Sequence, residues 1–314
     1  MKLKKLIGLM AVAGFALPGA AMATNGYFSS GYGMKANGMG GAATAMSDDA
    51  FGGANNPASM VFAGDRLDLG VTLFSPMRSA SRTGTAAGGV LNGDVSSDSN
   101  YFPVPEFGYN KMLNTNLSLG VTVYGNGGMN SDYAPLANGS NFLGGAGRLG
   151  VDLMQLIVAP TVAFKIAPNH SIGISPLIGY QRFKAEGLQG FGVDSNGAAA
   201  GGDNLGYDHS YGYGLRVGYM GKITPTITIG AAYATKMNMQ KFDKYKGLFA
   251  EQGGFDMPEN YNLGIAFKAT PDLTLALDYQ RINYSGVKSI ANPSTNILSA
   301  PLGASNGPGF GWQD

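Results

Sequence analysis

Side chains that could do chemistry are few in this chain of 314 residues, which contains no cysteine and only 2 histidines. His170 stands alone, while Asp208, His209 and Ser210 follow one another directly. Adjacency along the chain is not the geometry of a catalytic triad, in which a base must reach a nucleophile and be oriented by a third group. No second acid, histidine or cysteine stands at metal-ligand spacing. We therefore expect no enzyme, no metal site and no cofactor.

One cation is expected to face inward. Apolar and small or polar residues alternate over residues 207–223, and this parity places Arg216 on the face opposite the large apolar side chains. A guanidinium suits a carboxylate because it can donate two parallel hydrogen bonds. Arg216 is thus the predicted site for a ligand carboxylate. An ion pair of Arg216 with an inward Asp68 or Asp278 is an equally open interpretation.

A loop over residues 240–259 mixes apolar and basic side chains in a way that predicts an amphipathic helix. We expect it to form an outer groove that collects apolar, anionic molecules. Contact with anionic lipopolysaccharide is the alternative. The apolar residues of this groove are Phe242, Tyr245, Leu248 and Phe249.

The elements that would position these groups are β-strands, because apolar residues recur at every second position through most of the chain. In the segment Leu67–Leu73, for example, four aliphatic side chains fall on one face. The predicted strands cover residues 66–75, 103–111, 117–125, 150–166, 171–185, 207–223, 227–239, 258–269 and 273–284, with a tenth starting at Gly309.

The second face of these strands consists of Gly, Ala, Ser, Thr and Asn rather than the charged residues of a soluble sandwich. Aliphatic residues toward lipid and small residues inside are typical of a transmembrane β-barrel, and a soluble barrel is the alternative. Short turns such as 167–170 and 224–226 alternate with long loops. Outer-membrane barrels have short periplasmic turns and long outer loops. The sequence therefore predicts an all-β, antiparallel transmembrane barrel.

The first residues resemble an export signal. Residues 1–23 contain lysines, an apolar run over Leu6–Leu17 and the sequence Ala21-Met22-Ala23, so we expect a signal peptide that is cleaved before Thr24. The run is short of the roughly 20 residues that a membrane-spanning helix needs. A net charge of +1 argues against nucleic acid as a partner. The expected location is the bacterial outer membrane.

Residues 24–62, called the hatch below, do not alternate and are rich in Gly and Ala. Ser47 followed by Asp48 and Asp49 predicts the start of a short helix. The sequence Asn56-Pro57-Ala58 predicts a rigid corner that ends it, because proline fixes its own φ and restricts the residue before it. A segment with so little side-chain bulk fits inside a narrow space, whereas an ordinary Gly-rich linker is the alternative.

The sequence TNGYFSSGYG at Thr24–Gly33, the Gly/Ala run and the Asn56-Pro57-Ala58 corner resemble the FadL/TodX family of outer-membrane transporters for hydrophobic compounds. The resemblance implies a barrel of 14 strands plugged by an N-terminal hatch with short helices. About nine to ten strands are predicted here, so the barrel over residues 63–314 is expected to be incomplete at its C-terminus. The gating residues that it implies in the hatch are Thr24, Asn25, Gly26, Tyr27, Phe28, Asn56, Pro57 and Ala58.

The resemblance also implies a kink in the third strand that opens the wall sideways, and we assign it to Gly125, Gly127 and Gly128. The expected function is a monomeric channel for passive uptake of long-chain fatty acids or similar hydrophobic compounds. Its expected partners are a hydrophobic small molecule, outer-membrane lipid and lipopolysaccharide. A monoaromatic hydrocarbon channel of the TodX type and a structural or adhesive barrel without cargo are the alternatives.

Overall fold

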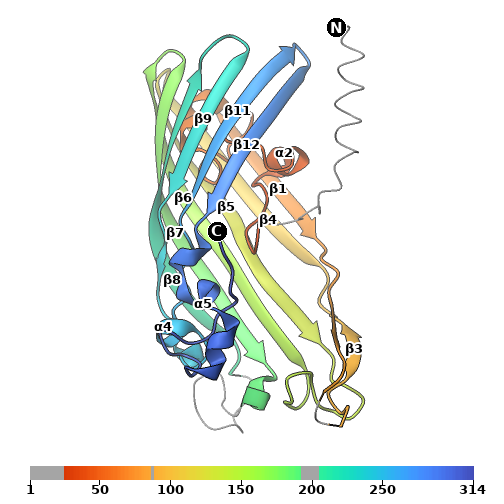
Figure 1. The fold of residues 1–314 in the computed structure, drawn as a ribbon. Helices are drawn as coiled ribbons and strands as arrows, with labels where there is room; N and C mark the ends of the chain where they lie inside the picture. The colour runs from red at the N-terminus through yellow and green to blue at the C-terminus, as the bar shows by residue number, and fades with distance from the viewer. Residues whose placement is uncertain (1–24, 86–87, 192–204) are drawn as a thin grey trace.

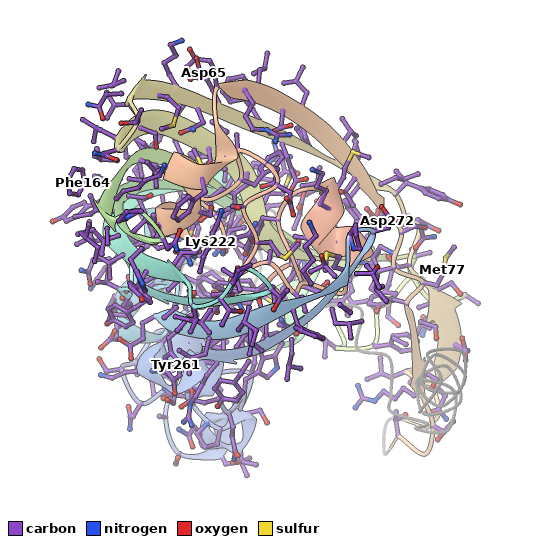
Figure 2. The ribbon with its side chains drawn as sticks, turned by 90° about the horizontal axis from the view of Figure 1, so that it is seen from above. Asp65, Met77, Phe164, Lys222, Tyr261 and Asp272 are labelled. Atoms are coloured by element: carbon purple, nitrogen blue, oxygen red, sulfur yellow. The ribbon has the colours of Figure 1, made fainter. Side chains whose placement is uncertain are left out.

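The fold is a large, strongly curled antiparallel sheet with the hatch inside its curve (Figures 1 and 2). The structure, a computed structural model, describes residues 25–85, 88–191 and 205–314. The main sheet has 10 strands in the order β1-β4-β5-β6-β7-β8-β9-β11-β12, and β10 pairs with β8. Neighbours in this order are also neighbours in the sequence of long strands, so each pair is a simple hairpin of antiparallel strands.

All nine strands predicted from residues 66 to 284 are confirmed, but with two differences in extent. The strand predicted over 117–125 continues to Tyr133, and the one predicted over 227–239 is interrupted after Ala234. The strands of the main sheet are β1 (Arg66–Phe74), β4 (Phe102–Asn114), β5 (Leu117–Tyr133), β6 (Leu149–Ala167), β7 (His170–Glu186), β8 (Asp208–Lys222), β9 (Ile227–Ala234), β10 (Asn238–Met239), β11 (Asn260–Thr270) and β12 (Leu273–Ile282). The tenth strand predicted at Gly309 is wrong, since residues 309–314 form no strand. They pack as irregular chain, with the amide of Trp312 bonded to the carbonyl of Ile290 at 3.1 Å.

A second sheet of two short strands, β2 (Ser79–Arg82) and β3 (Gly93–Ser96), lies in the connection between β1 and β4. No strand was predicted in either place. Its strands have only 4 residues each and carry small and polar side chains, so they leave no alternation of apolar residues to detect.

Many large apolar side chains of the main sheet point outward. Leu67, Leu69, Val71 and Leu73 of β1 are 56 to 69% exposed, whereas the residues between them face the hatch side. Figure 2 shows Phe164 on the outside of the curve and Lys222 beside the hatch ribbon. This arrangement confirms the predicted two-faced strands and matches an apolar surface turned toward lipid. None of the described helices has the length and apolar character needed to cross a membrane.

The hatch contains the short helices α2 (Met34–Gly38), η1 (Pro57–Ser59) and α3 (Met60–Ala63). No described helix begins at Ser47, because the local hydrogen bonds that a helix would need are made elsewhere. The carboxylate of Asp49 accepts the amide of Phe51 at 3.0 Å instead. The predicted corner starts a helix rather than ending one, since Asn56 caps η1 and Pro57 takes its first position.

The long loops at the other end of the sheet also form short helices, and α4 and α5 lie there in Figure 1. They include η2 (Leu188–Phe191), η3 (Asp243–Tyr245), α4 (Ala250–Gly253), η4 (Tyr284–Gly286), α5 (Lys288–Ala291) and η5 (Ser294–Leu298). The amphipathic helix predicted over residues 240–259 is therefore two separate short turns. Within α4 itself, Glu251 and Gln252 are in the left-handed region at φ 57 and 60, so this turn does not continue as a regular helix.

Strand glycines let the hatch backbone approach the wall closely. A Cβ atom at Gly173 of β7 would lie 2.3 Å from the carbonyl carbon of Pro57, and one at Gly218 of β8 would lie 2.1 Å from Oδ1 of Asn56. Both distances are too short for real contacts, so any side chain at these positions would displace the corner.

We predict that Gly173→Ala destabilises the seating of the corner by about 1–3 kcal/mol, the usual cost of overpacking a close contact. The measurement is hydrogen exchange of the amides from Asn56 to Met60. Gly38→Ala is the matched control, since a Cβ there meets nothing within 4 Å. Equal exchange in both variants would contradict the close approach.

Candidate functional site

The candidate site is the contact surface between the hatch and the inner face of the sheet, where carboxylates of the wall bind backbone amides of the hatch. Oδ2 of Asp278 in β12 accepts the amide of Ala43 at 2.9 Å and the amide of Thr44 at 2.8 Å. It also accepts the hydroxyl of Thr44 at 2.6 Å. One carboxylate thus fixes a turn of the hatch that has no regular secondary structure of its own.

Two further wall carboxylates act in the same way. Asp68 in β1 accepts the amide of Ala50 at 2.8 Å, and Arg66 holds that carboxylate with a bond of 2.7 Å. Glu106 in β4 accepts the amide of Gly33, the residue before helix α2, at 3.0 Å. Three acidic side chains of the inner face therefore bind the hatch backbone, and Asp68 also forms an ion pair with Arg66 of its own strand.

Neutral wall side chains bind hatch carbonyls. Nδ2 of Asn110 donates to the carbonyl of Met60 in the hatch and to that of Gly64 just after the hatch, at 2.8 Å each. The hydroxyl of Ser171 donates to the carbonyl of Ala58 at 2.7 Å. Together with the carboxylates they satisfy both donors and acceptors of a backbone segment that lies away from water.

The Asn56-Pro57-Ala58 corner is fully buried, with Asn56 and Ala58 at 0% exposure. Nδ2 of Asn56 donates to the carbonyl of Thr44 at 2.8 Å and to the carbonyl of Tyr219 in β8 at 2.9 Å. Its Oδ1 accepts the amide of Ala58 at 3.1 Å. The side chain of Asn56 therefore ties two parts of the hatch to each other and to the wall.

Arg216 points inward, as its parity predicts, and is 4% exposed. Its Nη1 donates to the carbonyl of Gly53 in the hatch at 3.3 Å, and its guanidinium lies beside the buried side chain of Tyr124. The ion pair with Asp68 or Asp278 is not formed. Among the described residues no carboxylate makes a salt bridge with Arg216.

The third strand of the main sheet, β5, carries a bulge at the predicted place. Its register against β6 shifts between Gly125 and Gly127, so that Asn126 is the extra residue. Gly127 has φ +154, and a Cβ there would lie 1.8 Å from the carbonyl oxygen of Tyr27. A Cβ at Gly128 would lie 2.3 Å from the carbonyl oxygen of Leu153. Glycine is therefore required at the bulge by close approach on both sides.

Beyond the bulge, β5 loses its partner on one side. The β4–β5 ladder ends at the pair Phe107 and Val123, although β5 continues to Tyr133. Hatch residues 27–29 take the vacated edge. The amide of Gly128 donates to the carbonyl of Tyr27 at 3.0 Å, and the amide of Ser29 donates to the carbonyl of Asn126 at 3.2 Å.

The same hatch residues insert their side chains into a buried aromatic cluster, named here the outer cluster. The rings of Tyr27 and Phe28 lie 5.2 Å apart, and that of Tyr27 lies 5.6 Å from Tyr284. Phe183 of β7 and the long loops supply the other rings. The aromatic members of the outer cluster are Tyr27, Phe28, Phe183, Phe242, Tyr245, Phe249, Phe255, Tyr284 and Trp312.

The predicted outer groove is thus closed in this structure. Phe242, Tyr245 and Phe249 are buried within the outer cluster, and Leu248 packs against it from a half-buried position. The rings of Phe183 and Phe249 lie 4.7 Å apart. A ligand that used these side chains would have to enter among them, because they do not line an open surface.

The start of the hatch also binds β12, the last strand of the main sheet, and the loop that follows it. Nδ2 of Asn25 donates to Oε1 of Gln280 in β12 at 2.6 Å, and the hydroxyl of Tyr284 donates to the carbonyl of Asn25. A Cβ at Gly26 would lie 2.4 Å from the hydroxyl of Tyr284. Thr24, the remaining predicted gating residue, lies outside the described residues, as does the predicted signal peptide.

Burial makes the tyrosine hydroxyls around the hatch harder to ionise. It raises the pKa of Tyr284 to about 12, and it raises the pKa values of Tyr27 and Tyr32 well above their usual range. These groups stay neutral at physiological pH and keep their protons for donation. Within the described part of the chain, no three acidic or histidine side chains are grouped as a metal site would require.

The sequence pointed to the corner, the bulge and Arg216, but it did not show the hatch-binding roles of Asp68, Glu106 and Asp278. Their signal is parity: each is an acidic residue at an inward position of a strand. Parity alone could not reveal that their partners are backbone amides of the hatch, because those amides come from segments far away in the sequence.

Comparison with known proteins agrees with this arrangement. A family model described as outer membrane protein transport protein (OMPP1/FadL/TodX) matches residues 9–306. The chain belongs to this family. It is an outer membrane transport protein, and the family is one of transporters rather than enzymes. The comparison with curated protein sequences gives no match.

Solved structures of this family share the fold at low identity. The Ralstonia pickettii toluene transporter TbuX is 19% identical, with a TM-score of 0.63, covering 82% of this chain and 73% of its own. The P. putida toluene transporter TodX is 17% identical, with a TM-score of 0.62 and coverages of 82% and 72%. A Pseudomonas aeruginosa FadL homologue is 15% identical, with a TM-score of 0.55 and coverages of 83% and 70%.

We predict that Asn56→Leu loosens the hatch by about 3 kcal/mol, because two backbone carbonyls lose their donor and about 1–3 kcal/mol is lost for each buried group left unsatisfied. Increased cleavage of the hatch by added protease, with the strands still resistant, is the measurement. Asn138→Leu is the control, since Asn138 lies in an exposed loop far from the hatch. A hatch as resistant as in the unchanged protein would show that the corner does not depend on this amide.

Proposed function

We propose that this protein is an outer-membrane channel for the passive uptake of long-chain fatty acids or similar hydrophobic compounds. One observation carries the proposal: hatch residues 27–29 complete the edge of β5 where its ladder with β4 has ended, and they fill the outer cluster at the same time. A single short segment therefore occupies both a place for an apolar molecule and a place where the wall lacks strand pairing.

In this mechanism an apolar ligand enters from the long-loop side and replaces the rings of Tyr27 and Phe28 in the outer cluster. For the rings, apolar surface is exchanged for apolar surface, so this part of the replacement costs little. The backbone hydrogen bonds between residues 27–29 and β5 are also broken, and their loss opposes the displacement. The hatch segment then leaves the edge of β5, and the bulge at Gly127 becomes a route through the wall into the membrane. Gating by the hatch and sideways exit thus follow from one displacement.

Arg216 is the proposed partner for the head group of a fatty acid. It is a buried cation whose hydrogen bond goes to a neutral carbonyl, that of Gly53, at 3.3 Å. A carboxylate would compensate the charge better than a carbonyl does, because hydrogen bonds between ionised partners are roughly twice as strong. The proposed cargo is therefore an apolar chain with a carboxylate end.

A monoaromatic hydrocarbon is the second candidate cargo. It is favoured by the aromatic lining of the outer cluster, in which the rings of Phe249 and Phe255 lie 4.8 Å apart. The structurally similar proteins TbuX and TodX are toluene transporters, and CymD is a monoaromatic hydrocarbon channel. We propose a monomer in either case, with outer-membrane lipid and lipopolysaccharide around its apolar outer face and long loops.

We predict that Arg216→Met lowers oleate uptake about tenfold and leaves toluene uptake unchanged. A hydrogen bond to a charged group contributes about 1.5–3 kcal/mol, and toluene has no carboxylate to lose it. Labelled oleate and labelled toluene are supplied to cells with the protein, with the variant, and without either. An equal loss of oleate and toluene uptake in the variant would reject Arg216 as a carboxylate site. If cells with the unchanged protein take up no more of either compound than cells without it, transport is rejected and a structural or adhesive barrel remains.

We also predict that replacing Asn56-Pro57-Ala58 by three glycines changes uptake severalfold without preventing membrane insertion. The strands keep their own pairing, whereas the hatch loses its rigid corner and the bonds of Asn56. A change in gel mobility on heating reports that the barrel is folded and inserted, and accumulation of labelled cargo in cells reports uptake. Unchanged uptake in a correctly inserted variant would remove the gating role of the corner.

A further inference from the structure

The inward side chains of β6 and β7 form layers along the strands. In β6, Leu153 belongs to the outer cluster, while Ile157 belongs to a separate middle cluster, and Gln155 lies between them at 4% exposure. The middle cluster is nearer the short turns. Its members are Tyr32, Ala54, Tyr124, Ile157, Ala159, Leu177, Ala234, Met237, Met239 and Met257.

The inward side chains of β7 follow the same sequence of layers, at the same height along the sheet. Phe183 lies in the outer cluster and Leu177 in the middle cluster, and Gln181 lies between them with 0% exposure. Gln155 and Gln181 face each other in the ladder of β6 and β7. A polar layer therefore separates two apolar layers of the interior.

This layer is one continuous chain of hydrogen bonds. Nδ2 of Asn126 donates to Oε1 of Gln155 at 2.9 Å, and Nε2 of Gln155 donates to Oε1 of Gln181 at 3.0 Å. Nε2 of Gln181 then donates to the carbonyl of Phe255 at 2.8 Å and to the hydroxyl of Ser210 at 3.3 Å. Every amide donates in the same direction, so the groups satisfy one another across four strands of the wall.

An apolar molecule cannot replace these bonds. Pushing a hydrocarbon between the amides would leave buried donors and acceptors without partners, at about 1–3 kcal/mol for each group. Displacing rings within the outer cluster carries no such cost. The chain of amides is therefore a barrier to apolar molecules, although it is made only of neutral side chains.

The barrier ends at the bulge. Asn126, its first member, is the extra residue of β5, and Phe107 and Val123 are the last pair of the β4–β5 ladder before it. A molecule in the outer cluster thus has the polar layer beneath it and, beside it, the edge of β5 that no longer pairs with β4. Tyr27 and Phe28 occupy this position in the present structure.

We propose that Asn126, Gln155, Gln181 and Ser210 form a polar floor that stops apolar cargo at the level of the bulge and directs it sideways. The floor determines the route of the cargo rather than its capture. It excludes hydrocarbon chains from the middle cluster, in the direction of the short turns. Arg216 lies on that side of the floor, beside Tyr124, so only the carboxylate end of a fatty acid would reach it, because amides can donate to a carboxylate but not to a hydrocarbon. This inference rests on the proposed function, since it takes a hydrophobic molecule as the occupant of the outer cluster.

The test maps where a bound apolar molecule lies. A long-chain fatty acid with a diazirine at the chain end is photolysed on the purified full-length protein in detergent, and its adducts are located by peptide mass spectrometry. Adducts at Phe183 and Phe255 report the outer cluster, and adducts at Met237 and Met257 report the middle cluster. Gln155→Leu/Gln181→Leu is the floor variant. Arg182→Leu, one residue along β7 on its outer side, is the control.

We expect adducts almost wholly in the outer cluster for the unchanged protein and the control. In the floor variant, we expect adducts at Met237 and Met257 to rise at least fivefold. Equal labelling of the middle cluster in all three proteins would overturn the floor. Heat-shift on gels confirms folding, and Gln155→Leu alone is used if the double variant does not insert. No specific adduct in any protein would contradict the proposed function itself.

Discussion

The structure depends on one constraint: an irregular backbone segment lies inside a sheet, where its polar groups must be bonded by protein. A strand satisfies its backbone through its neighbours, but the hatch has only short helices and turns. Side chains of the sheet supply the hydrogen-bond partners that the hatch backbone lacks. Asp278, Asp68 and Glu106 accept hatch amides, and Asn110 donates to a hatch carbonyl. The small and polar inner face is therefore a set of partners for the hatch as well as a lining with little bulk.

This constraint explains why glycines and acidic side chains occur together on the inner face. Gly218 lets Asn56 reach the backbone of β8, and Asp278 receives the turn at Ala43 and Thr44. Because glycine has no side chain, the backbones of the hatch and the strand can approach closely. A carboxylate on the inner face can then reach the amides of the hatch. Each contact is local, yet the contacts come from β1, β4, β5, β7, β8 and β12, so the hatch is held from around the curve.

The exception is the part of the hatch at Tyr27–Ser29, which binds the wall as a strand would. It uses the edge of β5 that the bulge at Asn126 and the end of the β4 ladder leave open. Such an edge exposes backbone groups that must find a partner in a membrane. A segment that can supply this partner and also withdraw it is a physical basis for a gate in the wall.

Much of the fold was determined by the sequence itself. Alternation of aliphatic and small residues placed nine strands, because a strand directs successive side chains to opposite faces whatever lies around it. The same parity placed Arg216 inside, and the family resemblance, together with the three glycines, pointed to the place of the bulge in β5. Expectations from local pattern failed where another part of the chain took the bonds. Ser47 begins no helix, since the amide of Ala50 goes to Asp68, and Gly309 begins no strand, since the following residues pack against helix α5.

Only the tertiary structure decided which side chains and backbone groups interact. Asp68 and Asp278 were equally good partners for Arg216 by parity, and both instead bind the hatch backbone. Phe242, Tyr245 and Phe249 had the spacing of an exposed groove, and they are buried around Phe183 and Phe255. Local pattern specifies the face on which a side chain lies because it depends on neighbouring dihedral angles. Which groups meet across that face depends on how the sheet curls and where the hatch lies within it, and this is a property of the whole chain.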